Sequence, residues 1–258
     1  MDKKKLKNTI EALLDTFLEA GKVAKEISEK GVKITIKPDK SPVTDGDLLV
    51  DKILREKIKD LTPSIPIISE ETVNLNIENK LKNFWLIDPI DGTKDYIQKK
   101  DEYTLNAGLI IDLKPAAGIV YAPAKDRLFF SYGKNLAYET CKRKTYQLNC
   151  SKKNSSKIIG LENSNNAPPE ILNIYKKYKV SQTLKMSSSL KFCVLAAGEA
   201  DIYAAKARAY EWDIAAGHAV LENAGGSITD FDGKSFFYGK SDYKNSAIIA
   251  KRAKKLET

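Results

Sequence analysis

Apolar residues recur at helical spacing over the first part of the chain, with lysines and acidic residues between them. This pattern predicts an amphipathic surface helix from about Leu6 to Lys30, which Gly31 ends. Residues 32–37 then alternate apolar and polar positions, as a half-buried strand does. Thr44 and Asp47 form a near capping box ahead of a second amphipathic helix, whose apolar positions are Leu48, Leu49, Ile53, Leu54 and Ile58.

Short apolar runs bounded by turns follow, and they predict strands. Strands are expected over residues 65–69 and 84–87, and an antiparallel meander over residues 103–148. Later in the chain, strands and helices alternate, which is typical of an α/β unit. The strands are expected at 157–161, 182–186 and 200–204, the helices at 169–179, 189–197 and 214–223, and two short strands close the chain.

These elements predict a layered sandwich of α+β and α/β character, in which helices and sheets alternate as α-β-α-β-α. The N-terminal half, residues 1–148, would be the α+β part with the antiparallel sheet and most of the candidate ligands. The C-terminal half, residues 149–258, would be α/β. The boundary is placed in a stretch rich in Lys, Asn and Ser at 142–156, and the active site is expected between the halves.

Composition narrows the class of protein. Of the 258 residues, 42% are hydrophobic and 30% are charged, as in soluble globular proteins. No apolar run approaches the roughly 18 residues of a membrane span, and no apolar segment of a signal peptide follows the charged start. Cys141, Cys150 and Cys193 lack the spacing of a zinc site or a redox pair. We therefore expect a cytoplasmic protein, with peripheral association at the inner membrane face left open.

The net charge of +9 favours anionic partners such as nucleotides, phosphates or nucleic acid. Only five of the 43 basic residues are arginine, the residue that binds phosphate in a bidentate manner, and the lysines are spread over the whole chain. A solvated surface explains most of them. We therefore expect small anions such as nucleotides or phosphates as partners and no dedicated nucleic-acid groove.

The first candidate chemistry lies just after the strand predicted at 84–87. The apolar run is expected to end at Asp88, and Pro89, which has no N–H to donate, is expected to force the chain out of the sheet. Asp91 follows, and Gly92-Thr93 begins a polar segment that suits a helix start. Two acids followed by free backbone N–H groups suit a bound cation and the anion that it carries.

Two further acids lie at the ends of predicted elements: Glu70 follows a strand, and Asp213 precedes a helix. If the four carboxylates converge, burial and mutual repulsion would raise their pKa values, and a hard divalent cation would remove that penalty. Oxygen ligands favour Mg²⁺ or Mn²⁺ over zinc. The alternative for each acid alone is a helix cap or a solvent-facing side chain. Other nucleophilic routes have little support, because no Gly-x-Ser-x-Gly is present and His218 and Cys193 fit packed helix positions.

Three motifs resemble the signatures of the inositol monophosphatase superfamily of Mg²⁺-dependent, lithium-sensitive phosphatases. They are Glu70-Glu71, Asp88-Pro89-Ile90-Asp91-Gly92-Thr93 and Trp212-Asp213-Ile214-Ala215-Ala216-Gly217. The segment from Ser187 to Cys193 is similar to the bacterial 3′(2′),5′-bisphosphate nucleotidase branch. The resemblance runs from the first helix to about Gly226. It implies removal of the 3′-phosphate from adenosine 3′,5′-bisphosphate, giving AMP and phosphate, in the recycling of a sulfotransfer by-product.

The resemblance also implies residue roles. Two or three Mg²⁺ ions would be held by Glu70, Asp88, the carbonyl of Ile90, Asp91 and Asp213, with Asp88 bridging. Thr93, hydrogen-bonded to Asp47, would orient or deprotonate the attacking water, and a further weak metal would lie near Glu70 and Asp47. Substrate contacts are implied for Glu70, Ile90, Asp91, Gly92, Thr93, Ser188, Lys191 and Asp213.

One position departs from the nucleotidase pattern. Ala205 stands where that branch usually has an arginine for the second phosphate, and Lys206 or Arg208 is left as a substitute. This departure keeps open an inositol or sugar phosphate monoesterase with the same metals. A nucleotide- or RNA-binding protein without catalysis is the alternative from another class. The resemblance leaves the oligomeric state open between a monomer and a homodimer.

Overall fold

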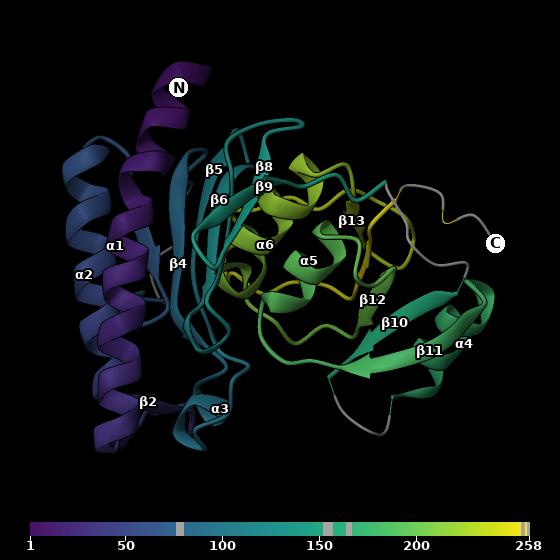
Figure 1. Ribbon diagram of the computed structural model, residues 1–258, viewed down its shortest axis with the longest axis horizontal. Helices are drawn as coiled ribbons and strands as arrows, with labels where there is room; N and C mark the ends of the chain where they lie inside the picture. The colour runs from purple at the N-terminus through teal and green to yellow at the C-terminus, as the bar shows by residue number, and fades with distance from the viewer. Residues whose placement is uncertain (76–79, 152–156, 164–166, 254–255, 257–258) are drawn as a thin grey trace.

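Helical and sheet layers alternate across the molecule in the order α-β-α-β-α, which confirms the predicted fold class (Figure 1). The computed structural model describes residues 1–75, 80–151, 157–163, 167–253 and 256. Within these residues, none of the helices is both long and apolar enough to cross a membrane.

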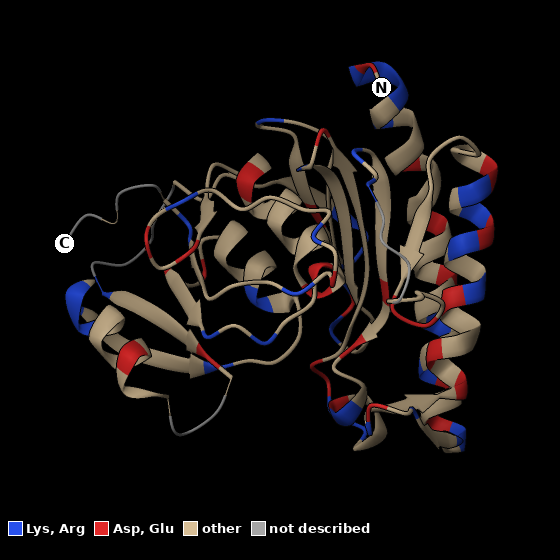
Figure 2. Ribbon diagram, turned by 180° about the vertical axis from the view of Figure 1, so that it is seen from behind, with Lys and Arg blue, Asp and Glu red and all other residues tan. Residues whose placement is uncertain are grey.

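The first helical layer consists of α1 (Lys3–Lys30) and α2 (Asp45–Leu61). The helical spacing predicted α1 well: Ile10, Leu13 and Phe17 are fully buried, and charged residues lie along the outer sides of both helices (Figure 2). In α2, Leu54 and Ile58 are buried, but Leu48 and Leu49 are 53% and 42% exposed. The apolar positions at the start of α2 therefore lie outside the core.

In the chain, α1 and α2 are connected by a two-stranded antiparallel ribbon of β1 (Ile34–Ile36) and β2 (Pro42–Thr44). The expectation of a half-buried strand at 32–37 was wrong in its burial, since all three residues of β1 are exposed. The reason is that β1 pairs only with β2 and joins neither of the larger sheets. Alternation alone could not distinguish this ribbon from a strand with one face in the core.

The second layer is a seven-stranded sheet with the order β3-β4-β5-β6-β7-β8-β9. Its strands are β3 (Ile67–Ser69), β4 (Phe84–Asp91), β5 (Thr104–Ile111), β6 (Lys114–Ala122), β7 (Arg127–Ser131), β8 (Ala137–Cys141) and β9 (Lys144–Gln147). β3 is parallel to β4, and every later pair is antiparallel. The predicted meander is therefore present, with a short 3₁₀ turn, η1 (Pro123–Lys125), between β6 and β7.

β4 does not end where the sequence predicted. It continues through Pro89 to Asp91, and its register against β5 shifts between Asp88, opposite Asn106, and Asp91, opposite Thr104. One extra residue on β4 makes this a β-bulge, and a bulge tolerates a proline because the ladder is interrupted there. The acids thus lie within a bulged strand end, and α3 (Thr93–Ile97) follows directly.

The central helical layer is made of α5 (Leu190–Ala196) and α6 (Glu211–Asn223). α6 lies directly on the seven-stranded sheet because β5 and β6 present glycines there. A Cβ on Gly108 would lie 2.8 Å from backbone atoms of α6, and one on Gly118 would lie 2.4 Å from the carbonyl oxygen of Ala216. α6 begins three residues earlier than predicted, so Asp213 belongs to its first turn.

The last sheet has five strands in the order β11-β10-β12-β14-β13, and α4 (Pro169–Lys177) covers its outer face (Figure 1). Its strands are β10 (Ile158–Glu162), β11 (Val180–Lys185), β12 (Ile202–Ala205), β13 (Ser227–Thr229) and β14 (Ile248–Lys251). The alternation predicted from residue 157 is confirmed, with strand and helix ends shifted by a few residues. The division into two domains stays a prediction, and residues 152–156 of its boundary stretch lie outside the described part of the chain.

Candidate active site

Three carboxylates from separate elements converge between the seven-stranded sheet and α6. Glu70 follows β3, Asp88 lies in β4 and Asp213 in the first turn of α6, and one oxygen of each lies within 4.8 Å of the others. Asp88 is 2% exposed, and its Oδ1 has no hydrogen-bond partner among the described residues. We call Glu70, Asp88 and Asp213 the acidic cluster.

The acidic cluster is electrostatically unfavourable without a cation. Burial raises the pKa of Asp88 well above its usual range, and the negative charges of Glu70, Asp91 and Asp213 raise it further. The pKa of Asp213 is raised by burial and then by Asp91 and Glu70. A buried, unpartnered carboxylate oxygen within an all-oxygen set fits a hard divalent cation such as Mg²⁺ or Mn²⁺.

Asp91 lies beside the acidic cluster but is held differently. Its Oδ2 accepts a hydrogen bond of 2.5 Å from the backbone N–H of Ser189, the residue before α5. Burial raises the pKa of Asp91, while the positive charge of Lys191 and the Ser189 hydrogen bond oppose that rise. The predicted ligand Asp91 therefore faces α5 with one oxygen, and it is not among the three residues whose oxygens converge.

Thr93 and Asp47 lie together, as the resemblance implied. The Thr93 hydroxyl is 3.3 Å from Oδ1 of Asp47 and 3.1 Å from the carbonyl oxygen of Ile90. Oδ2 of Asp47 accepts hydrogen bonds from the backbone N–H of Thr44 at 2.8 Å and from its hydroxyl at 2.5 Å. Asp47 thus completes the capping box of α2 and reaches Thr93 with its other oxygen.

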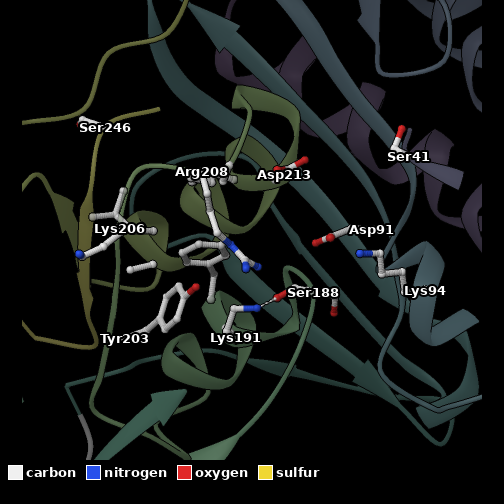
Figure 3. Close-up of a pocket in the computed structure, with 15 residues that line it drawn as sticks. Ser41, Asp91, Lys94, Ser188, Lys191, Tyr203, Lys206, Arg208, Asp213 and Ser246 are labelled. Atoms are coloured by element: carbon white, nitrogen blue, oxygen red, sulfur yellow. Dashed lines mark hydrogen bonds between the residues drawn. The ribbon is translucent and has the colours of Figure 1, made fainter. Parts of the chain in front are cut away.

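A cavity of about 460 Å³ extends from Asp91 and Asp213 to Tyr203 and Ala205 of β12 in the five-stranded sheet (Figure 3). Asp91 and Asp213 line one side of it, and Lys191, Tyr203 and Arg208 line another. The guanidinium of Arg208 and the ammonium of Lys191 point into the same space, whereas Lys206 points away (Figure 3). Lys206 forms an ion pair of 2.9 Å with Glu170. The cavity therefore joins a carboxylate side to a cationic wall, defined here as Lys191 and Arg208.

Lys191 is a buried lysine, with 5% of its surface exposed. Its ammonium donates to the carbonyl oxygen of Ser188 at 2.6 Å and lies 5.2 Å from the centre of the Tyr203 ring. Burial lowers its pKa to about 8, although the negative charge of Asp91 works in the opposite direction. Ala205 and Arg208 also line this cavity.

Comparison with known proteins identifies the family. Residues 5–258 match the inositol monophosphatase family. The chain is 36% identical to the 3′(2′),5′-bisphosphate nucleotidase CysQ of Buchnera aphidicola, over 86% of this chain and 85% of that protein. It is 32% identical to CysQ of Escherichia coli K12, over 81% and 84% of the two chains. The protein belongs to the inositol monophosphatase family.

Solved structures agree with that assignment. CysQ from Bacteroides thetaiotaomicron, described as a bacterial member of the family, has a TM-score of 0.79 and 26% identity, covering 97% of this chain and 98% of its own. An inositol monophosphatase from Anabaena shares the fold at a TM-score of 0.75 and 22% identity, over 96% and 92% of the chains. The predicted membership of this phosphatase family is confirmed.

Within this family fold, two residues near the site were missed by the sequence analysis. Lys37, in the loop between β1 and β2, places its ammonium 3.1 Å from Glu70 and 2.8 Å from Glu71. Glu71 has a pKa raised to about 7, chiefly by burial. Ser189 contacts Asp91 and Asp213. Lys37 has no local sequence signal, because it is one of many lysines, whereas Ser189 belongs to the Ser187–Cys193 segment that the resemblance singled out without giving Ser189 a role.

His218 and Cys193 occupy the packed positions that the sequence indicated. His218 is 1% exposed on α6, and its Nδ1 lies 2.8 Å from the Tyr238 hydroxyl. Cys193 is fully buried on α5, and burial raises the pKa of its thiol. Neither side chain lines the cavity between Asp91 and Asp213 on one side and the cationic wall on the other.

Proposed function

We propose that this protein is a Mg²⁺-dependent phosphatase that removes the 3′-phosphate from adenosine 3′,5′-bisphosphate, giving AMP and phosphate. The observation that carries the proposal is the cavity of about 460 Å³ with carboxylates on one side and the cationic wall on the other. A bisphosphate needs two anion sites, one at the reacting phosphate and one at the phosphate that is kept. The names of the CysQ relatives support the same substrate class.

Glu70, Asp88 and Asp213 would hold Mg²⁺, with Asp91 and the carbonyl of Ile90 as further ligands and two or three ions in total. When bound, such ions lower the pKa of water and stabilise the charge of a phosphoryl group in transfer. Oδ1 of Asp88, which has no hydrogen-bond partner in the described part of the chain, is the oxygen that most needs a cation. Asp88→Asn should therefore abolish Mg²⁺ binding in calorimetry.

Thr93 and Asp47 would handle the proton of the attacking water. Both groups near the Thr93 hydroxyl, Oδ1 of Asp47 and the carbonyl of Ile90, are acceptors, so the hydroxyl donates to one and keeps a lone pair for the water. Burial raises the pKa of Asp47, which makes it a better proton acceptor than an exposed aspartate. The new bond forms between the water oxygen and phosphorus as the bond to the 3′-oxygen breaks. The water gives one proton to the Thr93 oxygen as the Thr93 hydroxyl proton passes to Oδ1 of Asp47, and the 3′-oxygen takes a proton from solvent.

Arg208 would take the role of the arginine that Ala205 replaces. Lys206 and Arg208 both line the cavity, but the Lys206 ammonium points away from it and is paired with Glu170, whereas the Arg208 guanidinium points into it beside Lys191 (Figure 3). A guanidinium binds a phosphate through two parallel N–H donors, which an ammonium cannot do. The combination of Arg208 and Lys191 therefore favours a substrate with a second phosphate.

The proposal is tested by phosphate release with Mg²⁺ from adenosine 3′,5′-bisphosphate, adenosine 3′-monophosphate and inositol 1-phosphate. The bisphosphate should have the highest kcat/KM. Arg208→Met should raise the KM for the bisphosphate about tenfold, because only this substrate has the second phosphate, whereas the KM for the adenosine monophosphate should stay nearly unchanged. Lys206→Met is the matched control and should leave both KM values unchanged.

Faster turnover of inositol 1-phosphate would overturn the choice of substrate. It would favour the second candidate, an inositol or sugar phosphate monoesterase, which is supported by Ala205 and by the fold shared with inositol monophosphatases. Binding of Mg²⁺ and nucleotide without any phosphate release would overturn catalysis itself.

A further inference from the structure

Three consecutive serines, Ser187 to Ser189, connect β11 to α5 and reach residues that are distant in sequence. The backbone N–H of Ser187 donates to the Glu102 carboxylate at 2.8 Å, and its hydroxyl donates to the Glu102 carbonyl at 2.8 Å. The backbone N–H of Ser189 donates to Oδ2 of Asp91 at 2.5 Å. The Ser189 hydroxyl donates to the backbone carbonyl of Asp213 at 2.5 Å.

Ser189 therefore links two of the implied metal ligands directly. It is 1% exposed, so neither of its hydrogen bonds is shared with bulk water. The N–H fixes the rotation of the Asp91 carboxylate at the end of β4. The hydroxyl bonds a backbone carbonyl in the first turn of α6, the turn that carries Asp213. Outer hydrogen bonds of this kind orient metal ligands and affect cation affinity.

The preceding residue faces the cavity. Ser188 has a left-handed backbone, with φ of 54°, and its carbonyl accepts the hydrogen bond from the Lys191 ammonium. Ser188 and Lys191 both line the cavity, whereas Ser189 is turned toward Asp91 and Asp213. Two residues joined by a single peptide unit thus contact different parts of the site: Ser188 meets the cationic wall, and Ser189 meets Asp91 and Asp213.

α5 packs closely against α6. Gly217 of α6 leaves the space that Phe192 of α5 occupies, since a Cβ on Gly217 would lie 2.7 Å from the Cβ of Phe192. Phe192 follows Lys191 directly and is 3% exposed. A ligand that contacts Lys191 therefore meets a segment packed on the same helix that carries Asp213.

We propose that Ser189 is a positioning residue that sets the placement of Asp91 relative to Asp213, and that it couples ligand binding at the cationic wall to cation binding at the acidic cluster. The identity of the ligand, a nucleotide phosphate, rests on the proposed function. Coupling of this kind is reciprocal: a ligand at the wall strengthens cation binding by the same factor as the cation strengthens ligand binding.

The experiment is a calorimetric titration of the whole protein with Mg²⁺, with and without AMP, which carries the 5′-phosphate but cannot be hydrolysed at the 3′ position. Wild type should bind Mg²⁺ several-fold more tightly with AMP. Ser189→Ala keeps the N–H and loses only the hydroxyl, so its Mg²⁺ affinity should fall roughly fivefold, and the effect of AMP should nearly vanish. Ser189→Gly also keeps the N–H and should give the same result.

Ser187→Ala is the matched control. It removes the same group from the same segment, but that hydroxyl bonds Glu102 and no implied ligand, so Mg²⁺ affinity and the AMP effect should stay within twofold of wild type. An equal loss in Ser187→Ala, or no loss in either Ser189 variant, would overturn the positioning role. No effect of AMP on wild type would overturn the coupling. Absence of phosphate release from adenosine 3′,5′-bisphosphate, with the coupling intact, would count against the proposed function alone.

Discussion

The ammonium group of Lys37 lies 3.1 Å from Oε1 of Glu70, a member of the acidic cluster. It also lies 2.8 Å from Glu71, so a side chain from the β1–β2 loop supplies positive charge where a metal ligand would meet its cation. A fixed ammonium at roughly 4–8 Å from a divalent ion opposes its binding by about 1–2 kcal/mol even at the dielectric constant of water. Lys37 is therefore expected to weaken the affinity of the site for Mg²⁺.

Replacing Lys37 by Met should tighten Mg²⁺ binding roughly three- to tenfold, as measured by calorimetry at constant ionic strength. Lys40→Met is the control, because Lys40 is exposed in the same loop and takes part in none of the ion pairs found among the described residues. Unchanged or weaker Mg²⁺ binding in Lys37→Met would show that Lys37 mainly holds Glu70 in place.

The two roles of Asp47, helix cap and partner of Thr93, can be separated by mutation. Thr44→Ala removes the cap hydroxyl, which is worth about 1 kcal/mol, so Tm should fall by about 2–4 °C while kcat changes little. Asp47→Asn should lower kcat by about 10²–10⁴-fold, because the group that receives the water proton is lost. Thermal unfolding and steady-state kinetics of both variants test this. A kcat loss in Thr44→Ala as large as in Asp47→Asn would contradict it.

The cationic wall should weaken at alkaline pH. Because the pKa of Lys191 is lowered to about 8, its positive charge is present below pH 8 and is lost as the pH rises above that value. The KM for adenosine 3′,5′-bisphosphate should therefore rise between pH 7.5 and pH 9 by about tenfold, the loss of one charge-assisted contact. Lys191→Arg, which stays charged, should have a flat KM over this range. The same pH dependence in the arginine variant would assign the titration to another group.

The fold was predictable where periodicity is strong and local. The spacing of apolar residues predicted α1, and the alternation of strands and helices after residue 157 predicted the α/β layers. Both patterns can be recognised because a helix or strand that buries one face repeats its apolar residues at a fixed local spacing. The start of α6 was misplaced, since this helix is buried on nearly all sides and has no polar face to mark its first turn. The bulge at Pro89 depends on pairing with β5, which a local pattern does not contain.

The candidate site was predictable as a set of acids and in the contact between Thr93 and Asp47, but the contacts that hold Glu70 and Asp91 were not predictable. Glu70, Asp88 and Asp213 each belong to a recognisable sequence motif, and their carboxylates lie close together in the structure. The hydrogen bond from Ser189 to Asp91 spans 98 residues, and the one from Lys37 to Glu70 spans 33. Such contacts depend on tertiary packing, because serine and lysine have no property that distinguishes these positions from others in the chain.

The contact between β6 and α6 makes a final prediction about how the sheet places Asp213. A Cβ on Gly118 would lie 2.4 Å from the carbonyl oxygen of Ala216 and 2.9 Å from its Cα. These are backbone atoms, so α6 must move as a whole to admit the methyl group, and Asp213 in its first turn must move with it. Overpacking of this kind costs about 1–3 kcal/mol.

Gly118→Ala should therefore lower Tm by several degrees, at about 2–4 °C per kcal/mol, and should also weaken Mg²⁺ binding. Gly160→Ala in β10 is the matched control: its Cβ would lie 3.1 Å from Val180 and 3.2 Å from Tyr175, which are side-chain atoms away from the acidic cluster. It should lower Tm while Mg²⁺ affinity, measured by calorimetry below the unfolding transition, stays at the wild-type value. If Gly118→Ala lowered the Tm but kept the wild-type Mg²⁺ affinity, the position of Asp213 would not depend on the packing of α6 against β6.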